Sequence, residues 1–376
     1  MADESSPPDP VDWLTTARVA RAVARRDHLA DSYLYDSLTT DFAAVTIEAE
    51  ELVAEFTGLR ASNAARGAVV DRGQWIDANV ESMQRMLAPF TARVGERLTR
   101  GPVGSVGRRI AGTEMGMLLG YMSQRVLGQY DLLVPEETPA PTDPTGDGNE
   151  TTGDAVYYVG PNVLTIEKRF AFRPLEFRRW IAIHEVTHRA QFMGVPWLRE
   201  YFLSLVEETL GLVDPDPRSL VRAAARAAES LSRGRNPFEE AGIVGLFATD
   251  RQRELLARIQ ALMSLLEGHG NYVMNALGAR HVRGVERMER VLQQRRQVGG
   301  ITGQINKMLG LEMKLRQYDV GERFIRAVVR DAGLHAIDAA WQGPEWIPTL
   351  AEFDDPAAWL HRTGGLRPDA AYSIAR

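Results

Sequence analysis

The chain has 376 residues, a net charge of −6 at pH 7 and no cysteine. Its length is enough for one large domain or two ordinary domains. The lack of cysteine excludes disulfides, thiolate metal ligands and a cysteine nucleophile. With a pI of about 5.8 and 25% charged residues, the chain carries no basic excess suited to nucleic acid or to an anionic membrane, and we expect neither as a partner.

The N-terminal sequence and the hydropathy predict where the protein acts. The first ten residues are acidic and rich in proline, without the basic and apolar regions of a signal peptide. No stretch approaches 18 uninterrupted apolar residues, so no membrane span is expected. These features predict a cytoplasmic protein, and they do not predict its oligomeric state.

Most of the chain has apolar residues at intervals of three and four, which is typical of amphipathic helices. The sequence predicts helices at 11–30, 36–60, 73–100, 108–127, about 174–193, 197–212, 217–233, 250–278, 281–297, 303–317, 320–333 and 354–362. The expected fold class is therefore mainly α with a small β element.

Strand signals are confined to one place. Residues 155–159 (Ala-Val-Tyr-Tyr-Val) and 163–166 (Val-Leu-Thr-Ile) flank a Gly-Pro-Asn turn, which predicts two short strands joined by that turn. They directly precede the helix predicted at 174–193. Either strand could therefore lie beside that helix and align an extended substrate by β-addition.

Composition divides the chain into five parts. Residues 1–10 and 366–376 are predicted to be tails, the first of them disordered. Residues 135–154 are polar and rich in proline and glycine, which predicts a mobile surface loop that could act as a lid. The helical part 11–134 and the part 155–365, which holds the strand signals, are expected to form one continuous compact domain.

The strongest chemical signal is His184-Glu185-Val186-Thr187-His188, which reads HExxH. On a helix, residues i and i+4 lie one above the other, so both imidazoles can bind one zinc ion. Glu185 is the expected general base, since it can take a proton from a water at the metal. The pattern also occurs by chance, and the alternative is an amphipathic helix whose histidines are only packed or solvated.

A catalytic zinc site needs a third protein ligand and one open position. In the pattern HExxHxxGxxH the third ligand is a histidine six residues after the second, but that position here is Gly194. The best candidate is Glu267, because an unpaired carboxylate in its apolar helical context would be costly. His269 is the alternative. On a regular helix it points away from Glu267, although the glycines on either side of it could let the pair converge.

Other polar residues of the same segment are candidate partners of the site. Asn271 follows Glu267 by four residues and shares its helix face, so its amide could accept a hydrogen bond from the outer nitrogen of a zinc-binding histidine. His269 or Tyr272 could donate a hydrogen bond to the oxyanion of a tetrahedral intermediate. For Tyr272 the alternative is a packed aromatic side chain.

Several segments together resemble a known family. They are IHEVTHRAQF at 183–192, LLEGH at 265–269, LGQYD at 127–131 and LGLEMKLRQY at 309–318. The resemblance spans about Trp13 to Trp359 and is to the zincin-like metallopeptidase type 2 family, whose members are also described as hydrolases associated with biosynthesis of the deazaflavin coenzyme. It implies a largely helical zincin-like fold and zinc as the cofactor, and it implies no particular substrate.

The sequence thus favours a zinc-dependent hydrolase, specifically an intracellular metallopeptidase acting on a peptide or a small amide. His184, His188 and Glu267 would hold zinc, and Glu185 would activate water. Two alternatives stay open. One is a non-catalytic protein that keeps the zincin fold as a scaffold or binding module. The other is a hydrolase of a non-peptide amide or ester linked to deazaflavin coenzyme metabolism.

Overall fold

The computed structural model describes residues 9–25, 29, 32–99, 102–131, 155–212, 249–297 and 311–364. Within these ranges the chain is mainly helical with one small sheet, as the sequence predicts. No described helix combines the length and the apolar character needed to cross a bilayer.

Most of the predicted helices are confirmed. In chain order the α-helices are α1 (Trp13–Val23), α2 (Asp36–Thr57), α3 (Arg72–Thr99), α4 (Pro102–Ser123), α5 (Gly160–Phe170), α6 (Pro174–Gly194), α7 (Leu198–Gly211), α10 (Asp250–His281), α11 (Val285–Gln297), α13 (Leu311–Ala332), α14 (Leu350–Asp354) and α15 (Pro356–Arg362). Two 3-10 helices, η2 (Leu334–Trp341) and η3 (Pro344–Trp346), link α13 to α14. The helix predicted at 217–233 and the loop predicted at 135–154 lie outside the described residues.

The sheet differs from the predicted hairpin. It has three strands in the order β1 (Arg66–Val70), β3 (Ala155–Val159) and β2 (Gly128–Tyr130); β3 pairs in parallel with β1 and antiparallel with β2. The predicted second strand at 163–166 is wrong, because these residues lie in α5. Pro161 stands in the first turn of α5, where its fixed φ favours a helix start.

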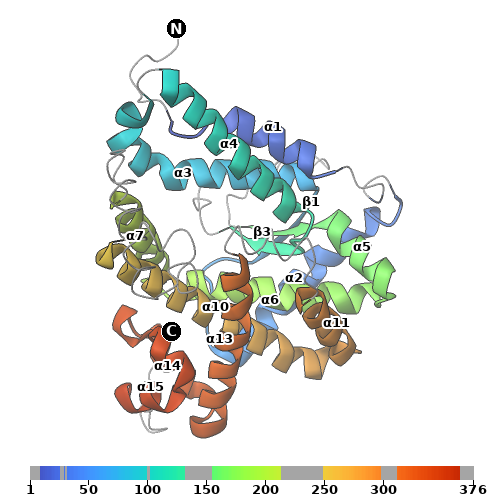
Figure 1. Ribbon diagram of the computed structural model, residues 1–376. Coiled ribbons are helices and arrows are strands. Elements are labelled where there is room, and N and C mark those ends of the chain that lie inside the picture. Colours follow the sequence, from blue (N-terminus) through green and yellow to red (C-terminus); the bar gives the residue numbers. More distant parts are fainter. Residues whose placement is uncertain are drawn as a thin grey trace.

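The central strand β3 separates two hydrophobic cores. Its residues Ala155, Tyr157 and Val159 pack in the core with α1, α3 and α4. The alternate residues Val156 and Tyr158 pack in the core with α2, α6 and α10. Figure 1 shows these two groups of helices on opposite sides of the sheet. All five residues of β3 are buried, as expected for a strand that is covered on both faces.

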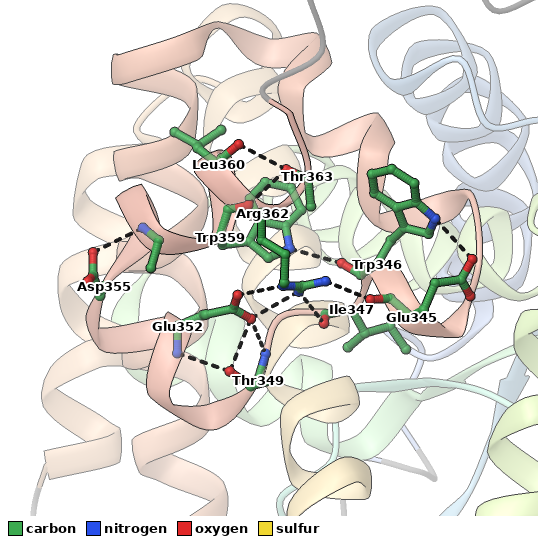
Figure 2. Close-up of polar contacts among 11 residues, drawn as sticks. Glu345, Trp346, Ile347, Thr349, Glu352, Asp355, Trp359, Leu360, Arg362 and Thr363 are labelled. Carbon is green, nitrogen blue, oxygen red and sulfur yellow. Dashed lines mark hydrogen bonds and ion pairs between the residues drawn. The ribbon is translucent and has the colours of Figure 1, made fainter.

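The C-terminal helices carry a polar network, here called the C-terminal cluster (Glu345, Ile347, Thr349, Glu352 and Arg362; Figure 2). The Arg362 guanidinium donates to both carboxylate oxygens of Glu352, at 2.6 and 3.0 Å, and to the carbonyl oxygens of Glu345 and Ile347, at 2.7 and 3.1 Å. Thr349 and Glu352 form a capping box at the start of α14. The network therefore satisfies a buried carboxylate and the backbone around it.

Candidate metal centre

Helix α6 lies between α2 and α10, in the hydrophobic core that contains Val156 and Tyr158 of β3 (Figure 1). Its observed bounds, Pro174–Gly194, confirm the predicted helix. Nearly every side of it is buried, including the charged Arg189, whose guanidinium bonds Glu50 at 2.6 Å and Asn63 at 2.8 Å. A helix that is buried all round offers a rigid support for a site.

Three predicted side chains converge between α6 and α10. The Nε2 atoms of His184 and His188 are 3.2 Å apart. Glu267 of α10 brings its Oε2 to 3.5 Å from Nε2 of His188 and 3.8 Å from Nε2 of His184. Their side chains keep 11 to 16% of their accessible surface, whereas Oε2 of Glu267, the oxygen that faces the imidazoles, is itself buried. Among the described residues, His184, His188 and Glu267 are the side chains placed to hold a metal ion, and they are called the metal group below.

The donor atoms fit a zinc ion. Zinc bonds of about 2.0–2.2 Å at tetrahedral angles hold neighbouring ligand atoms about 3.4 Å apart, and the observed separations run from 3.2 to 3.8 Å. Two neutral imidazole nitrogens facing each other at 3.2 Å repel unless a proton or a cation lies between them. Two nitrogens and one carboxylate oxygen are a ligand set that zinc favours.

Glycine allows α10 to approach the two imidazoles. A Cβ at Gly270 would lie 3.1 Å from Cε1 of His188 and 3.3 Å from Cε1 of His184. On another side of α10, a Cβ at Gly268 would lie 2.3 Å from the backbone of Gly321 in α13. The prediction that these glycines could loosen the helix is wrong, since α10 runs unbroken from Asp250 to His281. They permit close packing instead.

His269, the alternative third ligand, points away from the metal group. Its Nδ1 lies 2.9 Å from Nε2 of Gln191, and its ring packs edge-on against Trp341 at 5.2 Å. Burial, together with the charge of His188, lowers the pKa of His269 to about 3, so the ring is neutral. The structure therefore brings Glu267, and not His269, to the two α6 histidines.

Two further candidates do not make the predicted contacts. Asn271 is 1% exposed, and within the described structure its amide oxygen and nitrogen have no hydrogen-bond partner. The predicted hydrogen bond from a zinc-binding histidine to Asn271 is not formed. Instead, Nδ1 of His188 lies 3.0 Å from Oε1 of Gln191. Tyr272 packs against Phe56 at 6.4 Å, which matches the alternative of a packed aromatic.

Glu185 lies between the metal group and β2. Its carboxylate accepts a hydrogen bond from the Tyr130 backbone N–H. Burial and the charge of Glu267 raise the pKa of Glu185 to about 7, against the opposing effects of His188 and Tyr130. A Cβ at Gly128 would lie 2.6 to 2.9 Å from the Glu185 side chain, so the glycine leaves room for the carboxylate. A carboxyl with this pKa can accept and return a proton near neutral pH.

The strand beside the site is β2, which the sequence did not predict. The predicted candidate 155–159 is the central strand β3 and is paired on both edges. The N–H of Val159 donates to the carbonyl of Leu127 at 2.9 Å, so Leu127 and Gln129 face β3. By the alternation of antiparallel pairs, Gly128 and Tyr130 turn their backbone groups to the other side. That outer side of β2 is the one that meets Glu185.

Comparison with known proteins places the chain in a class. A family model described as zincin-like metallopeptidase matches residues 11–360. The chain therefore belongs to the zincin-like metallopeptidase family. This membership supports a hydrolase and implies a metal, typically zinc.

A solved structure is similar to nearly the whole chain. The crystal structure of a "putative hydrolase with a novel fold" from Chloroflexus aurantiacus is similar to this chain, with 28% sequence identity and a TM-score of 0.65. The similarity covers 94% of this chain and 99% of that one. No curated protein matches the sequence.

Proposed function

We propose that the protein is a zinc-dependent hydrolase of peptide or small amide bonds, with His184, His188 and Glu267 as the zinc ligands. The observation that carries the proposal is the convergence of two imidazole nitrogens and a buried carboxylate oxygen within 3.8 Å. Family membership supports the hydrolase class. A chain without cysteine is compatible with the reducing cytoplasm, where we expect it to act.

The proposed mechanism assigns the proton transfers to Glu185. Zinc in such a site polarises a carbonyl oxygen and lowers the pKa of water to about 7. The water oxygen attacks the carbonyl carbon while Glu185 takes one of its protons. The C–N bond then breaks as Glu185 returns that proton to the leaving nitrogen. Burial, which raises the pKa of Glu185, favours its holding that proton between the two steps.

The outer side of β2 is the proposed platform for an extended substrate. Gly128 and Tyr130 direct backbone groups to the side on which Glu185 lies; the Tyr130 N–H already donates to Glu185, so the platform consists of the Tyr130 carbonyl and the backbone groups of Gly128. An extended peptide can pair with backbone groups of this kind, whereas an ester has no N–H to donate. This arrangement favours a peptide or amide over the alternative of an ester.

The first test is metal content. Protein purified without added zinc should contain about one zinc per chain, and His188→Ala should contain none, because a catalytic site needs all three protein ligands. His335→Ala is the matched control, since that side chain is 92% exposed and bonds Asp338. Wild-type protein without metal would refute the enzyme proposal and favour the non-catalytic scaffold.

The second test separates catalysis from binding. Glu185→Gln should keep its zinc and lose at least about 100-fold of the hydrolysis rate, the lower range for general-base catalysis. The rate is measured by mass spectrometry on a mixture of synthetic peptides and small aryl amides and esters. Turnover of the peptide mixture by the variant at the wild-type rate would contradict the mechanism. Cleavage of esters alone would support the non-peptide alternative.

A further inference from the structure

Gln191 lies three residues after His188 on α6 and is fully buried. Its amide makes three contacts. Oε1 lies 3.0 Å from Nδ1 of His188, and Nε2 lies 3.1 Å from the carbonyl oxygen of Leu266 and 2.9 Å from Nδ1 of His269. The Gln191 side chain therefore links His188 of the metal group to the Leu266 carbonyl and the His269 side chain of α10.

The Leu266 carbonyl determines which way the Gln191 amide faces. A backbone carbonyl only accepts hydrogen bonds, so the amide group beside it must be the NH₂ donor, Nε2. The amide oxygen Oε1 then faces His188. This assignment follows from the chemistry of the carbonyl.

The direction of the amide in turn determines the proton on His188. Because Oε1 only accepts, Nδ1 of His188 carries the hydrogen and donates it to Gln191. A neutral imidazole has one N–H, so Nε2 carries the lone pair. That nitrogen is the one that faces His184 and Glu267.

His269 reinforces the same direction. Its Nδ1 lies 2.9 Å from Nε2 of Gln191, at hydrogen-bond distance from the second hydrogen of that NH₂ group. Packing against Trp341 holds the ring in this orientation. His269 is therefore not a ligand, but it contacts Gln191, which in turn contacts His188 of the metal group.

We propose that Gln191 is a positioning residue that selects the metal-binding tautomer of His188, with Leu266 and His269 holding its amide in place. This proposal rests on the zinc site of the proposed function. A merely structural role, in which Gln191 only ties α6 to α10, would affect stability and leave the tautomer unchanged. The two roles are separated by reading the histidine ring directly.

The first experiment uses wild-type protein. ¹⁵N NMR of the histidine rings in the zinc-loaded protein should show His188 protonated on Nδ1 and coordinated through Nε2. Coordination through Nδ1 would overturn the proposal whatever the variants do. If the wild type binds no zinc, the proposed function fails, and the Nδ1 signal is read in metal-free protein, where the contact with Oε1 of Gln191 again predicts a hydrogen on Nδ1.

The second experiment uses variants and chelator competition. Gln191→Leu should weaken zinc binding about 10–100-fold, the usual effect of losing the partner of a ligand histidine, and should diminish the Nδ1–H signal of His188. Thr187→Val is the matched control, because Thr187 is equally buried on α6 and its hydroxyl bonds only the Ile183 carbonyl, at 2.7 Å. Wild-type zinc affinity in Gln191→Leu would refute the proposal.

His269→Phe tests which contact anchors the amide. The Leu266 carbonyl still holds Nε2 of Gln191 in this variant, so the loss of zinc affinity should be smaller than in Gln191→Leu. An equal loss would show that the carbonyl is not the anchor, and that part of the proposal would be wrong.

Discussion

Two buried glutamates, Glu267 in the metal centre and Glu352 in the C-terminal cluster, are each 9% exposed and differ in their partners. Glu352 meets a permanent cation, Arg362, and the hydrogen-bond donors of Thr349 (Figure 2). Glu267 meets the imidazoles of His184 and His188, which become cations only by taking up a proton. Burial of a carboxylate alone therefore does not indicate function, whereas the kind of partner does.

The comparison also separates stability from binding. In the C-terminal cluster the positive charge is part of the chain, so the network is complete in the folded protein. In the metal centre, the carboxylate and the two imidazoles become complementary when a proton or a metal ion joins them. Substitutions in the C-terminal cluster should therefore alter the free energy of unfolding, and substitutions in the metal centre should alter metal binding.

The largest expected effect is on the metal. Glu267→Gln replaces the carboxylate ligand by a neutral amide and should weaken zinc binding by more than about 100-fold, beyond the range for residues outside the ligand set. Chelator competition measures the dissociation constant. Glu352→Gln is the matched control and should leave zinc binding unchanged. Similar zinc affinities in wild type and Glu267→Gln would remove Glu267 from the ligand set.

The next effect is on stability. Arg362→Met should lower the free energy of unfolding by about 2 kcal/mol, because Glu352 and the carbonyls of Glu345 and Ile347 lose their donor. Urea denaturation measures the change. Zinc affinity should stay at the wild-type level, and a parallel loss of zinc would contradict the separation of the two regions.

A smaller effect is expected from the glycine next to the imidazoles. Gly270→Ala places a Cβ 3.1 Å from His188 and 3.3 Å from His184, which should displace both rings and weaken zinc binding about 10-fold, in the range for disturbed ligand orientation. Gly107→Ala in α4 is the control, since nothing lies within 4 Å of the added Cβ. The control should stabilise its helix by up to about 1 kcal/mol.

The last expected effect is the pH dependence of stability in zinc-free protein, and it has opposite signs in the two regions. Burial lowers the pKa of His188, but the hydrogen bond and charge of Glu267 outweigh it and raise the pKa from 6.5 to about 9. This stabilisation is fully present below pH 6.5 and is lost as the pH rises through about 9. Burial raises the pKa of Glu352, but Arg362 and Thr349 outweigh it and lower the pKa below 4.5, so its stabilisation is present above pH 4.5 and lost in acid.

Urea denaturation across this pH range, with His188→Ala and Glu352→Gln, checks both signs. The stability difference between wild type and His188→Ala should shrink in base, and that of Glu352→Gln should shrink in acid. If both differences shrank on the same side, the assignment of partners would be wrong.

The features that could be predicted from the sequence are those that short local patterns specify. The helical spacing and Pro174 predicted α6, and HExxH together with an acidic residue in an apolar helix predicted the group that converges. The sheet was not predictable in the same way. Strand β2 has only three residues and its partner is distant in sequence, so no local periodicity marks it. The run 163–166 is rich in β-branched residues, but it follows Pro161, which stands in the first turn of a helix.

Gln191 was missed for a different reason. A neutral amide carries no charge or motif, and its role depends on a backbone carbonyl 75 residues later in the chain. Asn271 was the residue that helix geometry favoured, because it shares a face with Glu267. The contact between Gln191 and His188 is local, at i and i+3 on one helix, but the direction of the amide depends on a carbonyl of another helix, which the sequence does not state.

Strand β3 is the last of the three strands in the chain and the middle one in the sheet. On the ribosome, β1 and β2 therefore emerge before the strand that pairs them, and both remain unpaired until Val159 has been made. The HExxH helix follows within the next residues. Helices α1, α3 and α4 are thus synthesised before the sheet can form. During this interval the unpaired edges of β1 and β2 expose the nascent chain to association with other chains.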